Sequence, residues 1–144
     1  MFDNRCRGKD IQTKMWVPGY HIFDKKHYIV QNLKMIVRGT PELISAYEVD
    51  EKTLGRSSRF LDIDDRTVFE GDIVTWADNP HLRYVVRFGQ FTIAAGSAGQ
   101  SCTGFYLDLI SDCKHMMPID EPRCKELRVI GNVIDNPELL ERRV

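Results

Sequence analysis

Residues 82–88 read Leu-Arg-Tyr-Val-Val-Arg-Phe, with a large apolar side chain at every second position. Side chains of a β-strand alternate between two faces, so this stretch predicts a half-buried strand that carries Arg83 and Arg87 on its other face. Residues 72–76 (Asp-Ile-Val-Thr-Trp) form a second run, and the turn residues 77–80 (Ala-Asp-Asn-Pro) separate the two. Together these segments predict a β-hairpin.

The rest of the chain repeats this pattern of short apolar runs between turn residues. Runs of this length favour strands over long helices. We expect further strands at Met15–Phe23, His27–Gln31, Leu33–Arg38, Phe91–Ala95, Gly104–Ile110 and Leu127–Ile134. The prediction is a mainly β fold of about eight to ten short antiparallel strands, barrel-like or sandwich-like, with a short C-terminal helix.

Three features modify this strand pattern. Pro18 and Gly19 interrupt the first run and predict an edge strand or a bulge, because proline cannot donate to a strand ladder. Residues 96–101 (Gly-Ser-Ala-Gly-Gln-Ser) predict a flexible loop after the strand that ends at Ala95. Asn136 and Pro137 predict the cap and the first residue of the C-terminal helix.

The segment Thr40–Tyr47 supports two interpretations. Thr40 followed by Pro41 is typical of a helix N-terminus. Residues 47–49 (Tyr-Glu-Val) equally fit a strand. An α+β fold therefore stays open as an alternative.

The composition predicts one globular domain that covers residues 1–144. Apolar residues make up 42% and charged residues 28%, and 20 basic against 21 acidic side chains give a net charge of -1. This balance argues against a general affinity for phosphate backbones or anionic membranes. No run approaches the ~20 apolar residues of a membrane span, and the polar first ten residues lack the apolar stretch of a secretory signal. We expect a cytoplasmic protein with reduced cysteines and no membrane partner.

Two clusters contain residue types that bind metal ions. The first contains four soft ligands: Cys102, Cys113, His115 and Cys124. Structural zinc sites usually pair their cysteines roughly two to four residues apart, and no such pair occurs here, so free thiols are expected. The acidic run at 62–65 (Asp-Ile-Asp-Asp) has Thr67 and Ile73 where a calcium loop needs glycine and glutamate. A polar turn between strands is expected instead, and no metal or other cofactor is predicted.

No catalytic residue is predicted either. The sequence has no Gly-x-Ser-x-Gly elbow, and residues 96–101 lack the Gly-Lys-Ser/Thr ending of a phosphate loop. We expect the four histidines to be strand or turn residues rather than general bases: His21, His27, His81 and His115.

Arg83 and Arg87 are the candidate residues for a nucleic-acid interface. Arginines with aromatic neighbours on a small β-barrel can bind phosphates and stack on bases. Outward-facing arginines also keep a strand soluble, and the net charge gives nucleic-acid binding no support. The interface is therefore an alternative hypothesis.

Three blocks of the sequence resemble the YopX-like family. The first comprises Arg-Gly-Lys-Asp, Lys-Met-Trp-Val and Gly-Tyr within residues 7–20. The second joins Glu-Val-Asp and Thr-Leu-Gly within residues 48–55 to Phe-Glu-Gly-Asp-Ile-Val at residues 69–74. The third comprises Val-Ile-Gly-Asn-Val and Asn-Pro-Glu-Leu-Leu within residues 129–140. Their order and their span over nearly the whole chain make the resemblance more specific than any one block.

The resemblance implies a mostly β protein of a phage or prophage in a bacterial host cell, a homo-oligomer without an established activity or cofactor. Gly71 fits a tight turn, and Asp72 can bond backbone amides where a strand begins. Gly131 and Asn132 suggest a bulge or a close backbone approach. We expect structural roles for all residues of the family motifs: Gly8, Trp16, Gly19, Glu70, Gly71, Asp72, Gly131, Asn132 and Pro137.

The leading functional hypothesis is a non-enzymatic accessory module. It would associate with itself through strand edges and one apolar face, and would act by binding other macromolecules. One alternative is a nucleic-acid-binding barrel that uses Arg83 and Arg87. The other is an enzyme whose residues are scattered over several strands.

Overall fold

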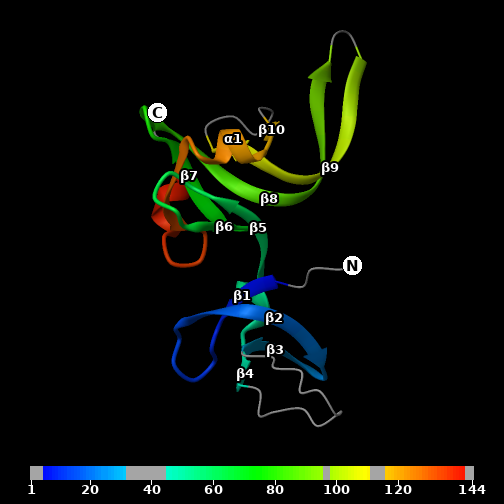
Figure 1. Ribbon diagram of the computed structural model, residues 1–144, viewed down its shortest axis with the longest axis vertical. Helices are drawn as coiled ribbons and strands as arrows, with labels where there is room; N and C mark the ends of the chain where they lie inside the picture. The colour runs from blue at the N-terminus through cyan, green and yellow to red at the C-terminus, as the bar shows by residue number, and fades with distance from the viewer. Residues whose placement is uncertain (1–4, 32–44, 96–97, 111–115, 142–144) are drawn as a thin grey trace. The chain divides into compact units, whose positions relative to one another are not determined.

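The computed structural model describes residues 5–31, 45–95, 98–110 and 116–141 (Figure 1). By its internal contacts the chain divides into two compact units, Met1–Arg56 and Ser57–Val144. The described residues form eleven strands, one four-residue α-helix and two 3₁₀ turns, and the strand pairs are antiparallel. The mainly β prediction is confirmed.

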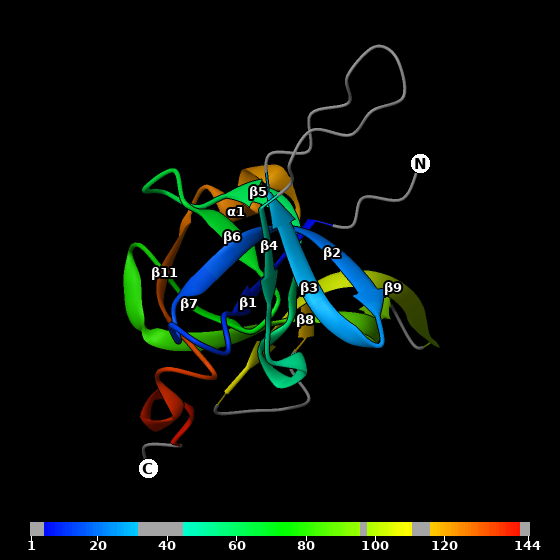
Figure 2. The ribbon, with the colours of Figure 1, turned by 90° about the horizontal axis from the view of Figure 1, so that it is seen from below.

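The N-terminal unit is built on the strand order β4-β3-β2-β1-β5. In Figure 2, β2, β3 and β4 run side by side. The strands and the 3₁₀ turn η1 of this unit have the bounds β1 (Arg5–Lys9), β2 (Trp16–Asp24), β3 (Lys26–Gln31), β4 (Ser45–Glu48) and η1 (Glu51–Thr53). Strand β5 (Gly55–Leu61) begins in this unit and continues into the C-terminal unit.

The core of the N-terminal unit follows from the two-residue period of its strands. Cys6 faces Gly19 across the β1–β2 pair, and Ile29 faces Tyr47 across the β3–β4 pair. The core cluster formed on this face contains Cys6, Val17, Ile29 and Val49, with Tyr47 and Leu54 packed against it.

Pro18 does not lie on an edge strand, and no bulge is found at it. Strand β2 pairs with β1 on one side and β3 on the other, and Pro18 faces Arg7 in a regular register. The pairing of β2 with β3 begins only at Tyr20, opposite Val30, so no β3 carbonyl needs the missing proline N–H. The side chain of Gln31 instead donates to the Pro18 carbonyl (2.6 Å).

The ambiguous segment is a strand where the structure describes it. Ser45–Glu48 forms β4, opposite β3. Residues 40–44, and the strand expected at Leu33–Arg38, lie outside the described residues.

The C-terminal unit contains a five-stranded sheet in the order β10-β9-β8-β7-β11. The elements of this unit are β6 (Thr67–Phe69), β7 (Asp72–Trp76), β8 (Asn79–Ala95), β9 (Ala98–Leu109), β10 (Met116–Pro118), α1 (Glu121–Cys124), β11 (Leu127–Asn132) and the 3₁₀ turn η2 (Pro137–Leu140). The core cluster contains Val68, Val74, Tyr84, Val86, Leu107, Cys124 and Leu127. Tyr84 and Val86 are thus buried on the apolar face expected from the alternating pattern of residues 82–88.

The hairpin of β7 and β8 is confirmed, but β8 is much longer than expected. It begins at Asn79 and runs through Gly89 to Ala95, and β9 pairs with it in one continuous register from Leu109 to Ala98. The separate strand expected at Phe91–Ala95 is therefore part of β8. Of the loop expected at residues 96–101, Ala98–Ser101 belong to β9, and residues 96 and 97 lie outside the described residues.

Strands β8 and β9 extend together beyond the rest of their sheet. Strand β7 pairs with β8 no further than Val85, and β10 pairs with β9 no further toward the hairpin end than Tyr106. We call the described remainder of the hairpin, residues 88–95 and 98–105, the arm. Figure 1 shows the green and yellow hairpin bending before it projects past α1 and β10.

Two facing glycines lie at the base of the arm. Gly89 pairs with Gly104, and both have a φ of 151°. L-residues with a side chain rarely adopt this backbone conformation. The glycine pair therefore lets both strands bend without a break in the ladder.

The helical segments are short. Pro137 starts η2, but the Asn136 side chain makes no cap hydrogen bond there. Helix α1 was missed by the sequence analysis, although Asp120 caps it by accepting from the Arg123 N–H (2.8 Å). Within the described part of the chain, no helix has the length and apolar character needed to cross a membrane.

Candidate functional site

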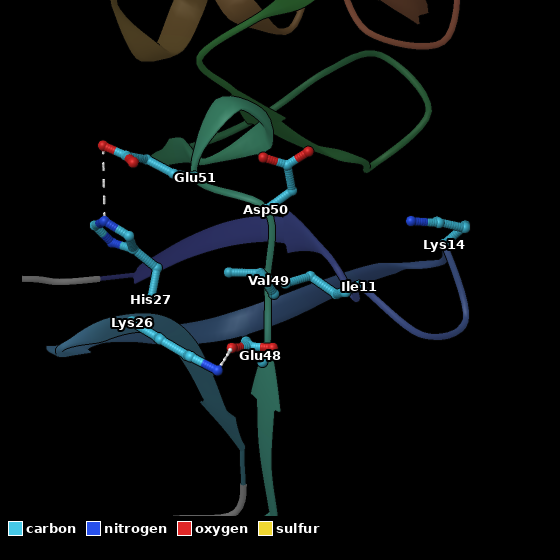
Figure 3. A pocket seen from close by; sticks show the side chains of 8 residues that line it. All are labelled: Ile11, Lys14, Lys26, His27, Glu48, Val49, Asp50 and Glu51. Carbon is cyan, nitrogen blue, oxygen red and sulfur yellow. Dashed lines mark ion pairs between the residues drawn. The ribbon is translucent and has the colours of Figure 1, made fainter.

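An open pocket of about 410 Å³ lies in the N-terminal unit (Figure 3). Six of its eight lining residues carry titratable side chains, and two opposite-charge pairs form between them. The lining residues are Ile11, Lys14, Lys26, His27, Glu48, Val49, Asp50 and Glu51.

Three local features bring these side chains together. Strand β3 begins with Lys26 and His27, while β4 ends at Glu48, directly opposite Tyr28. The Asp50 carboxylate then accepts from the Lys52 N–H (3.0 Å) and caps η1, which begins with Glu51. This cap turns Glu51 back toward β3.

Four of the titratable side chains of the pocket lie in two close pairs. Lys26 Nζ lies 3.1 Å from Glu48 Oε1, and His27 Nε2 lies 3.7 Å from Glu51 Oε1. Both pairs are drawn as dashed lines in Figure 3. The hydrogen bond to Glu48 is also the main reason why the pKa of Lys26 is raised.

The second ring nitrogen of His27 faces another histidine. Its Nδ1 lies 2.8 Å from Nε2 of His21, and the two ring planes differ by only 10°. Burial, and then the nearby His27, lower the pKa of His21. One ring must donate and the other must accept, so the contact requires at least one neutral imidazole.

The pocket does not place a hydroxyl or thiol nucleophile beside a base. In catalytic triads, a histidine beside a carboxylate activates a hydroxyl or thiol within hydrogen-bond reach. The eight lining residues include no Ser, Thr or Cys. Sequence analysis missed this pocket, because its residues come from separate segments between 11 and 51 and form no local motif.

The first family block supplies contacts within the N-terminal sheet. Arg7 Cζ lies 4.6 Å and Lys9 Nζ lies 5.4 Å from the Trp16 ring centroid. A Cβ at Gly8 would lie 2.9 Å from Val49 Cβ, and one at Gly19 would lie 2.5 Å from the Val30 carbonyl oxygen. Both glycines thus permit close packing.

The second block forms the turn between β6 and β7. Gly71 has a φ of 92°, a conformation that glycine adopts without strain. Asp72 is buried, and its Oδ2 accepts from the Phe69 N–H (2.8 Å). Glu70 follows Phe69 directly and is partly buried. This geometry is that of a strand-to-strand turn.

The third block joins β11 to η2. The register against β7 shifts between Val129 and Gly131, and a Cβ at Gly131 would lie 2.6 Å from Asn136 Oδ1. The Asn132 side chain accepts from the Asp135 N–H (2.8 Å), and Pro137 opens η2. The register shift fits the expected bulge, and the Asn136 and Leu139 side chains lie against the Gly131 backbone.

Both arginines of the nucleic-acid hypothesis form hydrogen bonds with other residues of the chain. An Arg83 guanidinium nitrogen donates to the Leu139 carbonyl (3.1 Å). Arg87 Nε donates to Asp108 (2.9 Å), across the β8–β9 pair. Phosphate groups would have to compete with these partners.

The two described cysteines of the candidate zinc cluster have different surroundings. Cys124 is buried in the core of the C-terminal unit, where burial raises its pKa to about 12, while Cys102 lies partly exposed in the arm. Cys113 and His115 lie outside the described residues. No group of three or more potential metal ligands occurs among the residues that are described.

Asp62 begins the polar turn expected at residues 62–65. It is buried, and its Oδ1 accepts from the Asp64 and Arg66 amides (2.9 and 2.8 Å). Its Oδ2 accepts from the Val129 amide (3.0 Å), so this carboxylate ties the turn to β11.

The arm is the second feature that sequence analysis missed as a candidate site. Residues 88–105 contain no Asp, Glu, Lys, Arg or Pro, although 28% of the whole chain is charged. This uncharged run was a signal available in the sequence. The aromatic rings at its base pair closely, Phe88 with Phe105 and Phe91 with Tyr106, each with centroids 4.9 Å apart.

Comparison with known proteins agrees with the three sequence blocks. A family model described as YopX protein matches residues 5–141, nearly the whole chain. No curated protein matches the sequence. The resemblance predicted from the sequence is confirmed, and the chain belongs to the YopX protein family.

Proposed function

We propose that the protein is a non-enzymatic accessory protein of a phage or prophage, which associates with itself and acts by binding other macromolecules. The resemblance to YopX-like proteins supports the phage setting. The arm supports the self-association, and it is the single observation on which the proposal depends.

The arm lacks the usual protection of an exposed sheet edge. Natural proteins protect such edges with charged residues, prolines or bulges, because unpaired N–H and C=O groups bind other strands. Residues 88–105 contain no charged residue and no proline, and β8 and β9 pair without a register shift. In the described part of the chain, no strand other than β8 or β9 pairs within the arm.

Pairing with further strands would also stabilise the arm. An isolated two-stranded hairpin is marginally stable in water. The ring pairs of Phe88 with Phe105 and Phe91 with Tyr106 stabilise the base of the arm, while the exposed Thr92 and Ser101 lie further out. A third strand would satisfy the edge groups of this outer part.

The pocket of the N-terminal unit supports the non-enzymatic part of the proposal. Its Lys26 and Glu48 side chains pair with each other, and its lining residues offer no hydroxyl or thiol beside His27. A histidine pair of this kind can serve as a structural contact between β2 and β3 without any reaction.

Light scattering over a wide range of protein concentration tests the self-association. We expect a mass that rises with concentration to a multiple of the 16.7 kDa chain. A strict monomer over the whole range would contradict the proposal.

An electrophoretic shift assay separates this function from the nucleic-acid hypothesis. At low salt, where counterion release most favours binding, we expect no shift of single- or double-stranded DNA. A shift that disappears in an Arg83→Ala/Arg87→Ala variant would replace the proposed function by nucleic-acid binding.

A further inference from the structure

The two edges of the arm can be assigned from the alternation of backbone groups along β8. The Ile110 amide donates to the Arg83 carbonyl (3.0 Å), and the Gly71 amide donates to the Val86 carbonyl (2.8 Å). In an antiparallel strand, successive residues turn their N–H and C=O groups to opposite sides. Odd-numbered residues of β8 therefore bond to β9, and even-numbered residues turn toward the other edge.

The same alternation continues into the arm, because the β8–β9 register has no shift from Tyr84 to Ala95. It turns the backbone groups of Gln90, Thr92 and Ala94 outward from the hairpin. On the opposite edge, the corresponding outward residues of β9 are Gly99, Ser101 and Thr103. The arm thus offers two edges, one on each strand.

We propose that the outer edge of β8 pairs with the same edge of a second copy of this chain, antiparallel and about a two-fold axis near Thr92. This inference rests on the proposed self-association and names its surface. The two arms would then form a four-stranded sheet in the order β9-β8-β8-β9. Pairing of one surface with itself closes at two copies, as in most homo-oligomers.

Charge is the reason to assign a second copy as the partner. Across a two-fold axis, residues near the axis face their own copies, so a charged edge would bring like charges together. Gln90, Thr92 and Ala94 are uncharged, as are all residues from 88 to 105. The edge is therefore compatible with itself and offers no charge for an oppositely charged partner to recognise.

Composition favours β8 over β9 for this pairing. The outward residues of β9 include Gly99, and glycine weakens a strand because it has no side chain to pack. Strand β8 has Phe91, Thr92 and Ile93 in sequence, three residue types enriched in strands.

Cysteine cross-linking tests the edge directly. Directly opposed residues of antiparallel strands have Cα atoms roughly 4.5–5.5 Å apart, which is within the range that a disulfide spans. In a background with Cys102→Ser and Cys113→Ser, we expect Thr92→Cys to give a disulfide-linked dimer on oxidation. Thr103→Cys is the matched control, because Thr103 is an equally exposed threonine on the edge of β9. Cross-linking through position 103 and not 92 would overturn the assignment.

A proline variant tests the same edge without a disulfide cross-link. Thr92→Pro removes an outward N–H but leaves the odd-numbered residues free to pair with β9. Two-fold symmetry removes this donor from both copies, so the dissociation constant of the dimer should rise about tenfold or more. Thr103→Pro should leave it unchanged, with circular dichroism as a check on folding.

The outcomes separate this inference from the proposed function. If the wild-type chain associates but Thr92→Pro does not weaken the dimer and Thr92→Cys does not cross-link, the β8 edge is wrong and self-association stands. If the wild-type chain is monomeric at all concentrations, both proposals fail.

Discussion

At the residue scale, the hydrogen bond between His21 and His27 in the N-terminal sheet depends on pH. The hydrogen bond between their ring nitrogens (2.8 Å) needs an acceptor, which a doubly protonated pair lacks. Glu51 lies 3.7 Å from the other nitrogen of His27, and the Phe23 ring packs against His27. Burial and His27 lower the pKa of His21 from its ordinary value of 6.5.

The lowered pKa of His21 predicts that acid destabilises the protein. The unfolded chain binds more protons than the folded one, so the free energy of unfolding falls as the pH drops below 6.5. Urea unfolding of the wild type and of His21→Gln, above and well below that pH, measures this difference. We expect a smaller fall in His21→Gln than in the wild type. Equal pH dependence in wild type and His21→Gln would show that the pair does not couple to folding.

At the element scale, Gly19 determines how closely β2 and β3 approach. A Cβ there would lie 2.5 Å from the Val30 carbonyl oxygen, a backbone atom that cannot rotate away. We expect Gly19→Ala to lower the free energy of unfolding by about 1–3 kcal/mol, the usual cost of overpacking. Denaturant unfolding measures the loss. Gly99→Ala is a suitable control, because its close contact would be with the Thr92 methyl group at 2.8 Å, and that side chain can rotate, while the Ile93 carbonyl oxygen would lie at an ordinary 3.8 Å. Similar losses in the two variants would argue against this explanation.

The elements differ in how far the sequence could predict them. The alternation at residues 82–88 identified a buried strand, because its period is local. The sequence predicted separate strands before and after Gly89. In the structure Gly89 continues β8, because Gly104 directly opposite allows the partner strand to bend with it. That pairing joins residues far apart in the chain, and the sequence alone does not show it.

The pocket was missed for the same reason, since β3, β4 and η1 meet only in the folded sheet. In contrast, Asp120 was a local helix-cap signal that could have predicted α1.

At the scale of the whole molecule, β5 takes part in the strand pairing of both units. Gly55 and Arg56 pair with β1, while Ser57 and Leu61 pair with β6. The family model also spans both units, as one match over residues 5–141. The single domain expected from the sequence stays a prediction.

The two tryptophans of the chain allow this prediction to be tested unit by unit. Trp16 belongs to the N-terminal unit, beside Arg7 and Lys9, and Trp76 belongs to the other, where its indole N–H donates to the Tyr84 hydroxyl (3.2 Å). Trp16→Phe leaves a fluorescence reporter in the C-terminal unit only, and Trp76→Phe leaves one in the N-terminal unit only. If the chain unfolds as one domain, the fluorescence midpoint in urea should coincide with the circular dichroism midpoint in each variant. A fluorescence transition that precedes the circular dichroism transition in one variant and follows it in the other would mean that the units unfold separately.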